Sequence, residues 1–395
     1  MGVLFGRQPF AGFGKNRLET SAGAAALYRI QGSRSSQLRA RIRQECPQRP
    51  GVYGMLDARG ELIYVGKAKD LRCRLLSYFR SKSRDPKAGR ILRQTRTICW
   101  ECVPSEFAAL LRELELIRRW RPDFNVQGQP GRRPRTFLCL GRKPAPYLFL
   151  TRKPARGFVG LWGPVIAGPL SRQAVRWLND WYRLRDCPQA QTMSFADQAE
   201  LFPDERAAGC LRYEIGTCLG PCAALCSQSA YSAQVRAARL FLDGSDPSPL
   251  ATVEAQMQQA AAELAFERAA VLREKLKALG WVTKQLARLR QAREQFNFIY
   301  PVTGHGGGQT WYLIRRGYVV TALPAPLDAE ERARTAQVVR AVFEKKLATL
   351  PRQVDEMEGV SLVLGWFSRH SGEQQRVISI EDAVSASGSS PCHIR

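Results

Sequence analysis

The chain has 395 residues and a formal net charge of +25, with 60 lysines and arginines against 35 aspartates and glutamates. Such an excess of positive charge favours a polyanionic partner, most often a nucleic acid, with an anionic membrane surface as the alternative. The sequence has no apolar run of about eighteen residues and no secretory leader pattern, so a transmembrane helix and export are not expected and the cytoplasm is the default compartment. Eleven cysteines in a cytoplasmic chain favour metal binding or burial over disulfides.

The first 34 residues are rich in glycine, alanine and arginine and show little periodicity, which predicts a flexible basic extension. A short helix is expected at 35–45. Residues 50–79 then predict a β-hairpin followed by a basic helix, with the two strands at 52–56 and 61–65. Four cations crowd the beginning of that helix: Lys67, Lys69, Arg72 and Arg74.

Two tyrosines, Tyr53 and Tyr64, fall on the paired strands and are expected to lie side by side. Further cations follow the basic helix: Arg80, Lys82, Lys87 and Arg90. A third strand is expected at 97–103. Because Cys99 and Cys102 lie three positions apart on this strand, they face opposite ways and are predicted to pack rather than to bind a metal together.

A helix that Ser105 can cap follows the third strand, with an apolar stripe that includes Phe107 and Leu110. Glu113 falls near the edge of this stripe, where a carboxylate can reach from a core helix into a cleft. Taken without its surrounding sequence, Glu113 is more readily interpreted as one more solvated glutamate than as a ligand.

Two tripeptides carry a resemblance to a known family. Residues 51–53, Gly-Val-Tyr, and residues 64–66, Tyr-Val-Gly, resemble the paired motifs of the GIY-YIG nucleases, with valine for isoleucine in both. The flanking Pro50 and residues 67–69, Lys-Ala-Lys, look like the version found in the UvrC and Cho excinucleases.

The sequence around Glu113 extends this resemblance. Residues 109–118 and 122–125 are similar to the UvrC stretch that carries a metal-binding glutamate and, beyond it, an asparagine typical of the fold. These two residues correspond to Glu113 and Asn125. The residues on either side of Glu113 depart from the family pattern.

The resemblance implies an α+β nuclease domain over residues 35–130, a small antiparallel sheet flanked by helices. It implies phosphodiester hydrolysis with one divalent ion, Mg²⁺ or Mn²⁺, on Glu113. Tyr64 is the expected general base and Tyr53 its helper or the alternative base. Either phenol is a poor base at its ordinary pKa of about 10, so nearby cations are expected to lower that pKa.

The cations of the domain receive two kinds of role. Lys67 and Arg74 are expected to act on the tyrosines, and Arg74 to bind the scissile phosphate. Asn125 is expected to position either the backbone or the phosphate. Six other cations are expected to contact the DNA backbone without regard to sequence: Lys69, Arg72, Arg80, Lys82, Lys87 and Arg90.

Residues 131–245 predict a second, cysteine-containing α+β domain, with strands at 137–140 and 146–151 and a helix at 171–185. Four cysteines cluster in its second half: Cys187, Cys210, Cys218 and Cys222. By type and spacing, four thiols are compatible with zinc, with iron–sulfur or with plain burial. The segment also resembles the cysteine motif of UvrC, which implies a [4Fe-4S] cluster, with zinc as the alternative.

A linker at 244–249 precedes two predicted helices, 251–264 and 266–279, within a domain expected to span 246–290. Residues 263–273 resemble the UVR motif, a helical hairpin that docks on its counterpart in UvrB. The expected partner-binding residues are Phe266, Glu267, Ala270 and Leu272. The resemblance therefore implies UvrB as a partner, UvrA upstream, lesion-bearing duplex DNA as the substrate, and no membrane.

Residues 291–395 carry no recognised motif and predict a small α+β region. Three strands are expected, at 296–300, 310–315 and 318–323. A helix is expected at 330–346, and the serine- and glycine-rich end, 385–395, is expected to be disordered. The RNase H-like nuclease and helix-hairpin-helix motifs of full-length UvrC are not recognised here, so one nick 3′ to the lesion is expected, as in Cho. A non-catalytic adaptor for DNA and UvrB, and a stand-alone GIY-YIG endonuclease, are the alternatives.

Overall fold

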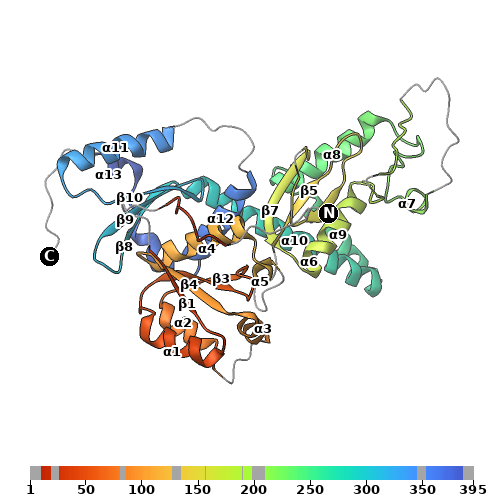
Figure 1. Ribbon diagram of the computed structural model, residues 1–395. Coiled ribbons are helices and arrows are strands. Elements are labelled where there is room, and N and C mark those ends of the chain that lie inside the picture. The colour runs from red at the N-terminus through yellow and green to blue at the C-terminus, as the bar shows by residue number, and fades with distance from the viewer. Residues whose placement is uncertain are drawn as a thin grey trace. The chain divides into compact units, whose positions relative to one another are not determined.

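The computed structural model describes residues 10–18, 26–80, 86–126, 135–155, 157–188, 190–197, 210–344 and 353–385. These residues form an α+β structure with three antiparallel sheets, which confirms the predicted fold class (Figure 1). The chain divides into two compact units. The first comprises Met1–Arg132, Arg293–Thr349 and Leu362–Arg395, and the second comprises Arg133–Ala292 and Leu350–Ser361. No helix within the described ranges is long and apolar enough to cross a membrane.

The first unit contains a four-stranded sheet in the order β1-β4-β2-β3, all antiparallel. Its strands are β1 (Leu27–Gln31), β2 (Gly51–Leu56), β3 (Leu62–Ala68) and β4 (Thr97–Cys102). The predicted hairpin is the β2–β3 pair, in which Tyr53 lies opposite Gly66 and Met55 opposite Tyr64. The edge strand β3 therefore carries one of the two tyrosines and its neighbour β2 the other.

The two glycines of the paired tripeptides are required by close contacts. A Cβ atom at Gly66 would come within 2.5 Å of the Tyr53 hydroxyl oxygen, and a Cβ atom at Gly51 within 2.5 Å of both the Glu101 carbonyl oxygen and a Leu71 methyl. Gly66 thus lets the Tyr53 ring cross the neighbouring strand. Gly51 lets the first helix after β3 approach the sheet.

Helices cover both faces of this sheet. On one face, α1 (Ser35–Glu45), α2 (Leu71–Ser77) and α3 (Pro86–Gln94) bury apolar side chains against Tyr53, Tyr64 and Trp100. On the other face, α4 (Glu106–Trp120) packs on β2 and β3 through Ala109 and Leu116. Cys99 packs in the core between the sheet and α4, and Cys102 lies beside the core on the α1, α2 and α3 side, so the two cysteines pack on opposite faces as predicted.

The predicted flexible extension over residues 1–34 is wrong for its described parts. Residues 27–31 form β1, and Phe10 and Phe13 are buried against Leu116 beneath α4. Phe10 also meets the Trp120 ring edge-on at 5.0 Å. The apolar gain from burying two aromatic rings explains why a segment of this composition does not remain unfolded. Residues 1–9 and 19–25 lie outside the described ranges.

Arg112 fastens this segment to the sheet. Its guanidinium pairs with Glu101 of β4 (3.0 Å) and with Glu115 one turn further along α4 (2.8 Å), and it donates to the carbonyl oxygens of Gly14 and Lys15. The side chain is almost fully buried. The departure from the family pattern beside Glu113 is therefore a structural ion pair that holds the N-terminal segment in place.

The remainder of the first unit is a three-stranded antiparallel sheet with helices. Its strands, β8 (Phe298–Thr303), β9 (Gln309–Arg315) and β10 (Tyr318–Pro324), and the helix α11 (Ala329–Glu344) confirm the predicted elements. Three further elements were not predicted: α12 (Gln353–Phe367), which belongs to the second unit up to Ser361, the 3₁₀ segment η1 (Ser371–Arg376) and α13 (Ile380–Ser385). The predicted tail falls, beyond Ser385, outside the described residues.

The second unit has a sheet in the order β6-β5-β7, formed by β5 (Arg135–Leu140), β6 (Leu148–Thr151) and β7 (Gly160–Ile166). The helices α6 (Pro169–Trp181) and α8 (Gln228–Asp243) pack against it. The short α7 (Leu211–Glu214) lies in the cysteine-rich stretch. The strand β7 was not predicted.

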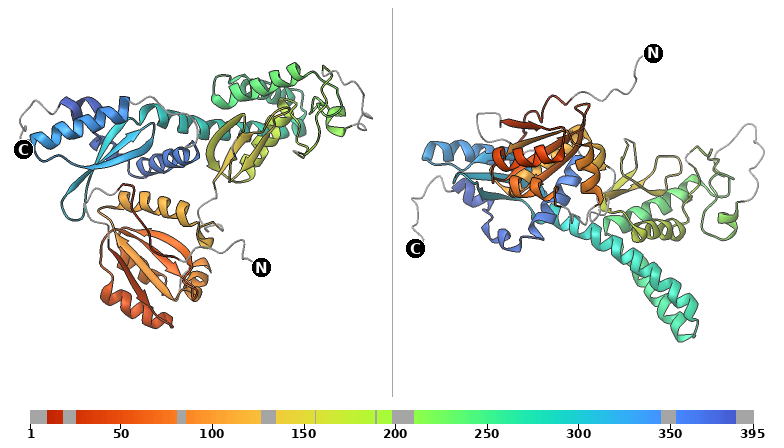
Figure 2. Two further views of the ribbon diagram at one scale, coloured as in Figure 1. Left: turned by 45° about the horizontal axis from the view of Figure 1, so that its top comes forward. Right: turned by 60° about the horizontal axis from the view of Figure 1, so that its bottom comes forward.

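The two helices after the linker are α9 (Ser248–Ala262) and α10 (Phe266–Gln295). The predicted end of the second helix, at 279, is wrong: α10 continues for several turns. Leu279, Val282 and Leu286 of this continuation join Val253 of α9 in the core of the unit, because the apolar spacing persists past the motif. The base of the hairpin is thus anchored, while its tip extends from the unit (Figure 2).

Replacing Arg112 with methionine should destabilise the first unit, because it leaves Glu101 buried without its guanidinium partner. Removing one member of a buried ion pair typically costs about 3–5 kcal/mol. The thermal midpoint should fall, and hydrogen–deuterium exchange should accelerate in β1 and in residues 10–18. The matched control is Arg334→Met, which removes an exposed ion pair with Glu330 on α11 and should change neither. Unchanged exchange in the Arg112 variant would contradict the fastening role.

Candidate active site

Three tyrosines meet on the face of the sheet that α1, α2 and α3 cover. Tyr53 of β2, Tyr64 of β3 and Tyr78 at the end of α2 have ring centroids 6.1–6.4 Å apart, and the hydroxyls of Tyr53 and Tyr78 are hydrogen-bonded at 2.9 Å. The predicted proximity of Tyr53 and Tyr64 is therefore seen. Tyr78 was missed, although its place one helical turn after Arg74 is a signal that could have found it.

Two cations lie against these rings. The Arg74 Nε donates to the Tyr53 hydroxyl oxygen at 3.3 Å, and its guanidinium carbon lies 5.4 Å from the Tyr78 ring centroid. The Lys87 ammonium of α3 lies 5.7 Å from the Tyr64 ring centroid. Arg74 is held at this point because Asp70 caps α2, accepting a hydrogen bond from the Cys73 backbone at 2.8 Å.

Burial controls the ionisation of two of the tyrosines. Burial raises the pKa of Tyr53, the nearby Tyr64 adds to the rise, and Arg74 and the hydrogen bond with Tyr78 offset it only in part. Burial likewise raises the pKa of Tyr78, with Tyr53 and Tyr64 adding to it. Arg74 thus acts to lower the pKa of Tyr53, as expected, but burial outweighs it and the pKa of Tyr53 is raised. Both phenols remain protonated at neutral pH and can donate hydrogen bonds.

Asn125 of α5 (Asp123–Val126) binds the free edge of β3. Its side-chain oxygen accepts from the Val65 amide at 2.7 Å, and its side-chain nitrogen donates to the Val65 carbonyl at 2.8 Å. Of the two positioning roles expected for Asn125, the structure contains the contact with the backbone.

Lys67 and Glu113 come from β3 and α4. Lys67 pairs with Glu106, the first residue of α4, with 2.8 Å between Nζ and Oε1. Glu113 lies two turns further along α4 and is only 6% exposed. A buried carboxylate on a helix that packs against β3 suits a hard cation such as Mg²⁺. Within the described residues no three histidines, cysteines, aspartates or glutamates gather as a metal site, so such a cation would need water or phosphate oxygens as further ligands.

The six cations expected on the DNA-binding surface divide into four groups. Lys69, Arg80 and Arg90 are exposed, in keeping with the expectation. Lys87 is 4% exposed and lies over Tyr64, so its assignment to the surface is wrong; the apolar residues beside it on α3 draw it into the core. Arg72 is half-buried and donates to the Cys46 carbonyl oxygen. Lys82 lies outside the described residues.

The four cysteines of the second unit are free thiols. The Cys187 sulfur accepts a hydrogen bond from the buried Arg185 at 3.2 Å, and the Cys218 sulfur accepts one from the Gly220 amide at 3.4 Å. Burial raises the pKa of Cys222, and the neighbouring Cys187 and Cys210 add to the rise, so the thiols lie close enough to interact. As arranged, however, no three of them meet as metal ligands.

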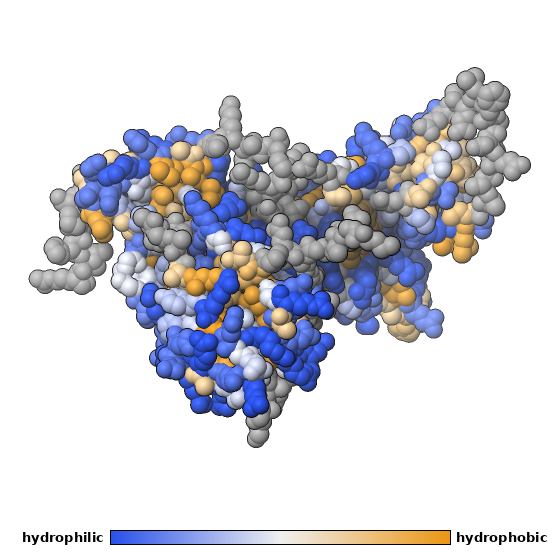
Figure 3. Space-filling view, viewed as in Figure 1, coloured by the Kyte–Doolittle hydropathy of each residue, from blue (hydrophilic) through white to orange (hydrophobic). Residues whose placement is uncertain are grey.

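The tip of the α9–α10 hairpin exposes apolar side chains. Leu264 and Phe266 are 71% and 66% exposed, and Glu267 and Ala270 are exposed beside them. Leu272, in contrast, is half-buried against the core of the unit. Exposed apolar side chains also gather around α7, at Leu211 and Ile215 (Figure 3).

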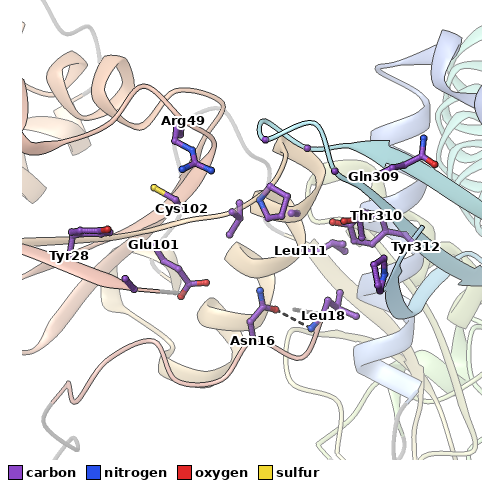
Figure 4. Close-up of a pocket in the computed structure, with 18 residues that line it drawn as sticks. Asn16, Leu18, Tyr28, Arg49, Glu101, Cys102, Leu111, Gln309, Thr310 and Tyr312 are labelled. Atoms are coloured by element: carbon purple, nitrogen blue, oxygen red, sulfur yellow. Dashed lines mark hydrogen bonds between the residues drawn. The ribbon is translucent and has the colours of Figure 1, made fainter. Parts of the chain in front are cut away.

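A pocket of about 520 Å³ lies elsewhere in the first unit (Figure 4). Asn16, Tyr28 and Arg49 line it on one side, and Gln309 and Tyr312 on the other. None of the tyrosines of the site, nor Glu113, lines this pocket. The chemistry expected from the sequence therefore lies on a different surface.

Three family models match the chain in succession. They are the UvrC-like GIY-YIG domain at residues 49–126, the middle domain of the UvrC/Cho excinuclease at 137–241, and the UvrB/UvrC motif at 248–280. A solved structure, the GIY-YIG N-terminal endonuclease domain of UvrC from Thermotoga maritima bound to its catalytic magnesium, is 35% identical. The match covers 22% of this chain and 94% of that domain, with a TM-score of 0.21.

Curated relatives carry the name UvrABC system protein C. The protein from Pseudomonas savastanoi pv. phaseolicola is 28% identical over 86% of this chain and 58% of its own length. The protein from Pseudomonas syringae pv. tomato is 35% identical over 63% of this chain and 38% of its own length. The matches thus span between about two fifths and three fifths of these relatives. The chain is therefore similar to the UvrC/Cho excinucleases over three segments in unbroken order, and to proteins named UvrABC system protein C.

Proposed function

We propose that the chain is a metal-dependent DNA endonuclease of nucleotide excision repair, which makes the incision 3′ to a lesion in a complex that depends on UvrB. The observation that carries this proposal is the grouping of three tyrosines with Arg74 on one side of the β2–β3 hairpin. A domain that only binds DNA has no physical need for buried, hydrogen-bonded phenols beside a cation. The middle domain and the UvrB/UvrC motif in the same chain support the repair context.

Tyr64 is the proposed general base. Tyr53 and Tyr78 hydrogen-bond to each other and stay protonated, so they are better suited to donate protons or hydrogen bonds. Tyr64 lies within ring contact of both, on the edge strand. In the proposed reaction Tyr64 acts as a phenolate whose oxygen takes the proton of the attacking water, and the other two phenols hold the water and the phosphate.

Arg74 and Lys67 are the proposed phosphate ligands. The guanidinium can bind two phosphate oxygens at once, and the Lys67 ammonium can add a point charge. Their charge opposes the negative charge that develops on the phosphorus oxygens in the transition state. Glu113 is the residue that would hold a divalent cation, which when bound stabilises charge on the phosphate and on the leaving 3′ oxygen.

UvrB is the proposed partner of the α9–α10 tip. Leu264 and Phe266 are large apolar side chains with most of their surface in solvent, and such side chains on a helical hairpin suit an apolar groove of a partner. The anchored base of α10 holds the tip at a fixed angle to its own unit. UvrA would act upstream, and the cytoplasm is the proposed location.

The four cysteines are the proposed ligands of an iron–sulfur cluster, with zinc as the alternative. Support comes from their mutual proximity and from the N–H···S hydrogen bonds to Cys187 and Cys218, since the sulfur ligands of a cluster commonly accept such bonds. The arrangement in the structure would have to close before all four could bind one cluster, because no three of the described thiols form a site.

Changing Glu113 to glutamine should abolish cleavage and leave DNA affinity nearly unchanged. The substitution preserves size but removes the charge that holds the cation, so the rate should fall by about a thousandfold or more. The measurement is incision of an end-labelled duplex with one defined adduct in the presence of UvrA and UvrB, together with a binding titration. The wild-type chain should yield one product, cut 3′ to the adduct. Cleavage by the variant at close to the wild-type rate would show that Glu113 is not part of the active site.

Replacing Phe266 with serine should abolish UvrB-dependent incision while nonspecific DNA binding persists. A tip substitution is preferable to deleting the hairpin, since Leu279 and Val282 belong to the core of the second unit. The matched control is Leu240→Ser, which alters an exposed leucine of α8 in the same unit and should have no effect. Binding of UvrB by the Phe266 variant at wild-type affinity would reject the docking role.

Protein purified without oxygen should be brown and contain iron and sulfide. Replacing both Cys210 and Cys222 with serine should remove the colour and the metal together, whereas replacing the exposed Cys73 of α2 should not. If the protein contains one equivalent of zinc and no iron, the four cysteines form a structural zinc site and not an iron–sulfur cluster. Absence of both metals would leave the cysteines with a packing role only.

A further inference from the structure

The carboxylate of Glu106 lies beside a proposed catalytic cation and has no role in the reaction as described so far. Its Oε1 is 2.8 Å from the Lys67 Nζ, and the side chains of Lys67 and Glu106 are 17% and 31% exposed. The ion pair joins the edge strand β3 to the first turn of α4. It is therefore a contact between the element that carries Tyr64 and the element that carries Glu113.

The backbone at Glu106 is fixed on both sides. Ser105 caps α4 by accepting a hydrogen bond from the Ala108 amide at 3.1 Å. Phe107 is fully buried, and its ring meets Tyr300, Tyr312 and Trp366 edge-on or tilted at 4.9–5.2 Å. These three rings come from β8, β9 and α12. The C-terminal part of the first unit therefore fixes the beginning of α4 by packing around Phe107.

The charges around Glu106 keep it ionised. Burial alone would raise the pKa of its carboxyl, but the hydrogen bond and charge of Lys67 outweigh this effect and the pKa lies below its ordinary value. His370 and Lys69 also face the carboxylate and act in the same direction. Glu106 is thus an anion at neutral pH and a permanent partner for the Lys67 ammonium.

A lysine without such a partner samples many rotamers, and fixing it at a phosphate costs side-chain entropy. The ammonium has three N–H donors, of which the Glu106 contact uses one. Two donors remain for phosphate oxygens. The carboxylate of Glu106, whose backbone is fixed by the Ser105 cap and by the packing of Phe107, can therefore hold the Lys67 ammonium in place. The ammonium keeps two N–H donors for the substrate.

We propose that Glu106 is a positioning residue for the cleavage, which acts by holding Lys67 where the scissile phosphate binds. This inference rests on the proposed nuclease function. The competing possibility for the same contact is restraint, in which Glu106 occupies Lys67 and must be displaced by the DNA. The two possibilities predict opposite effects on the incision rate. If Glu106 positions Lys67, removing Glu106 slows incision; if Glu106 restrains Lys67, removing it makes incision faster.

The test is a double-mutant cycle on the full chain, with Glu106→Ala, Lys67→Ala and both together. Single-turnover incision of the lesion-bearing duplex is measured with UvrA and UvrB, and DNA affinity is measured separately. Glu106→Ala should slow incision by about 10- to 100-fold, the cost of a small misplacement at a reacting centre. Affinity should stay the same or increase, because one negative charge is lost. In the Lys67→Ala background the Glu106 change should have no further effect.

Glu106→Gln keeps the shape and the oxygen that contacts Lys67, so its incision rate should lie between those of wild type and Glu106→Ala. Glu45→Ala, which breaks an exposed ion pair on α1, is the matched control and should cut at the wild-type rate. Faster incision by Glu106→Ala, wild-type rates for both Glu106 variants, or equal losses in the presence and absence of Lys67 would each overturn the inference. If the wild-type protein makes no incision, or if the Glu113→Gln variant cuts at the wild-type rate, the proposed function and the inference are both overturned.

Discussion

The contact between the Tyr53 ring and Gly66 is the constraint on which the site depends. The hydroxyl oxygen of Tyr53 would lie 2.5 Å from any Cβ at position 66, so the ring can cross the neighbouring strand only where that strand has no side chain. This crossing brings Tyr53 against Tyr64 and allows the hydrogen bond to Tyr78 from the following helix. The two tripeptides are therefore linked by packing, because Gly66 of the second provides the space that the Tyr53 ring of the first occupies.

Much of this arrangement could be predicted because its signals are local. A change of period from two to 3.6 residues places a hairpin before a helix, and the spacing of apolar residues on α4 places Glu113 beside its buried stripe. The strands β8 to β10 and helix α11 followed from the same kind of pattern. Such signals come from neighbours in the sequence, and tertiary contacts reinforced them here.

The features that were missed depend on partners far apart in the chain. Phe10 and Phe13 stand alone in a glycine-rich stretch, and only the groove beneath α4 makes them core residues. Arg112 departs from the family pattern beside Glu113, and its partner is Glu101, eleven residues earlier on another element. Lys87 was predicted to be a surface cation because its charge can be read from the sequence. Its contact with the ring of Tyr64, which places it in the core, cannot be read there. Contacts of this kind carry no periodicity that a single sequence can display.

The hydrogen bonds from Asn125 to Val65 have a consequence for association between molecules. An edge strand such as β3 presents unpaired amides and carbonyls, which are a template for a strand from another chain. Asn125 imitates such a strand at one residue, since its side-chain amide both accepts from Val65 and donates to it. A residue placed beside the chemistry thereby blocks β-sheet extension at the middle of this edge, and protects β3 from pairing with a strand of another copy.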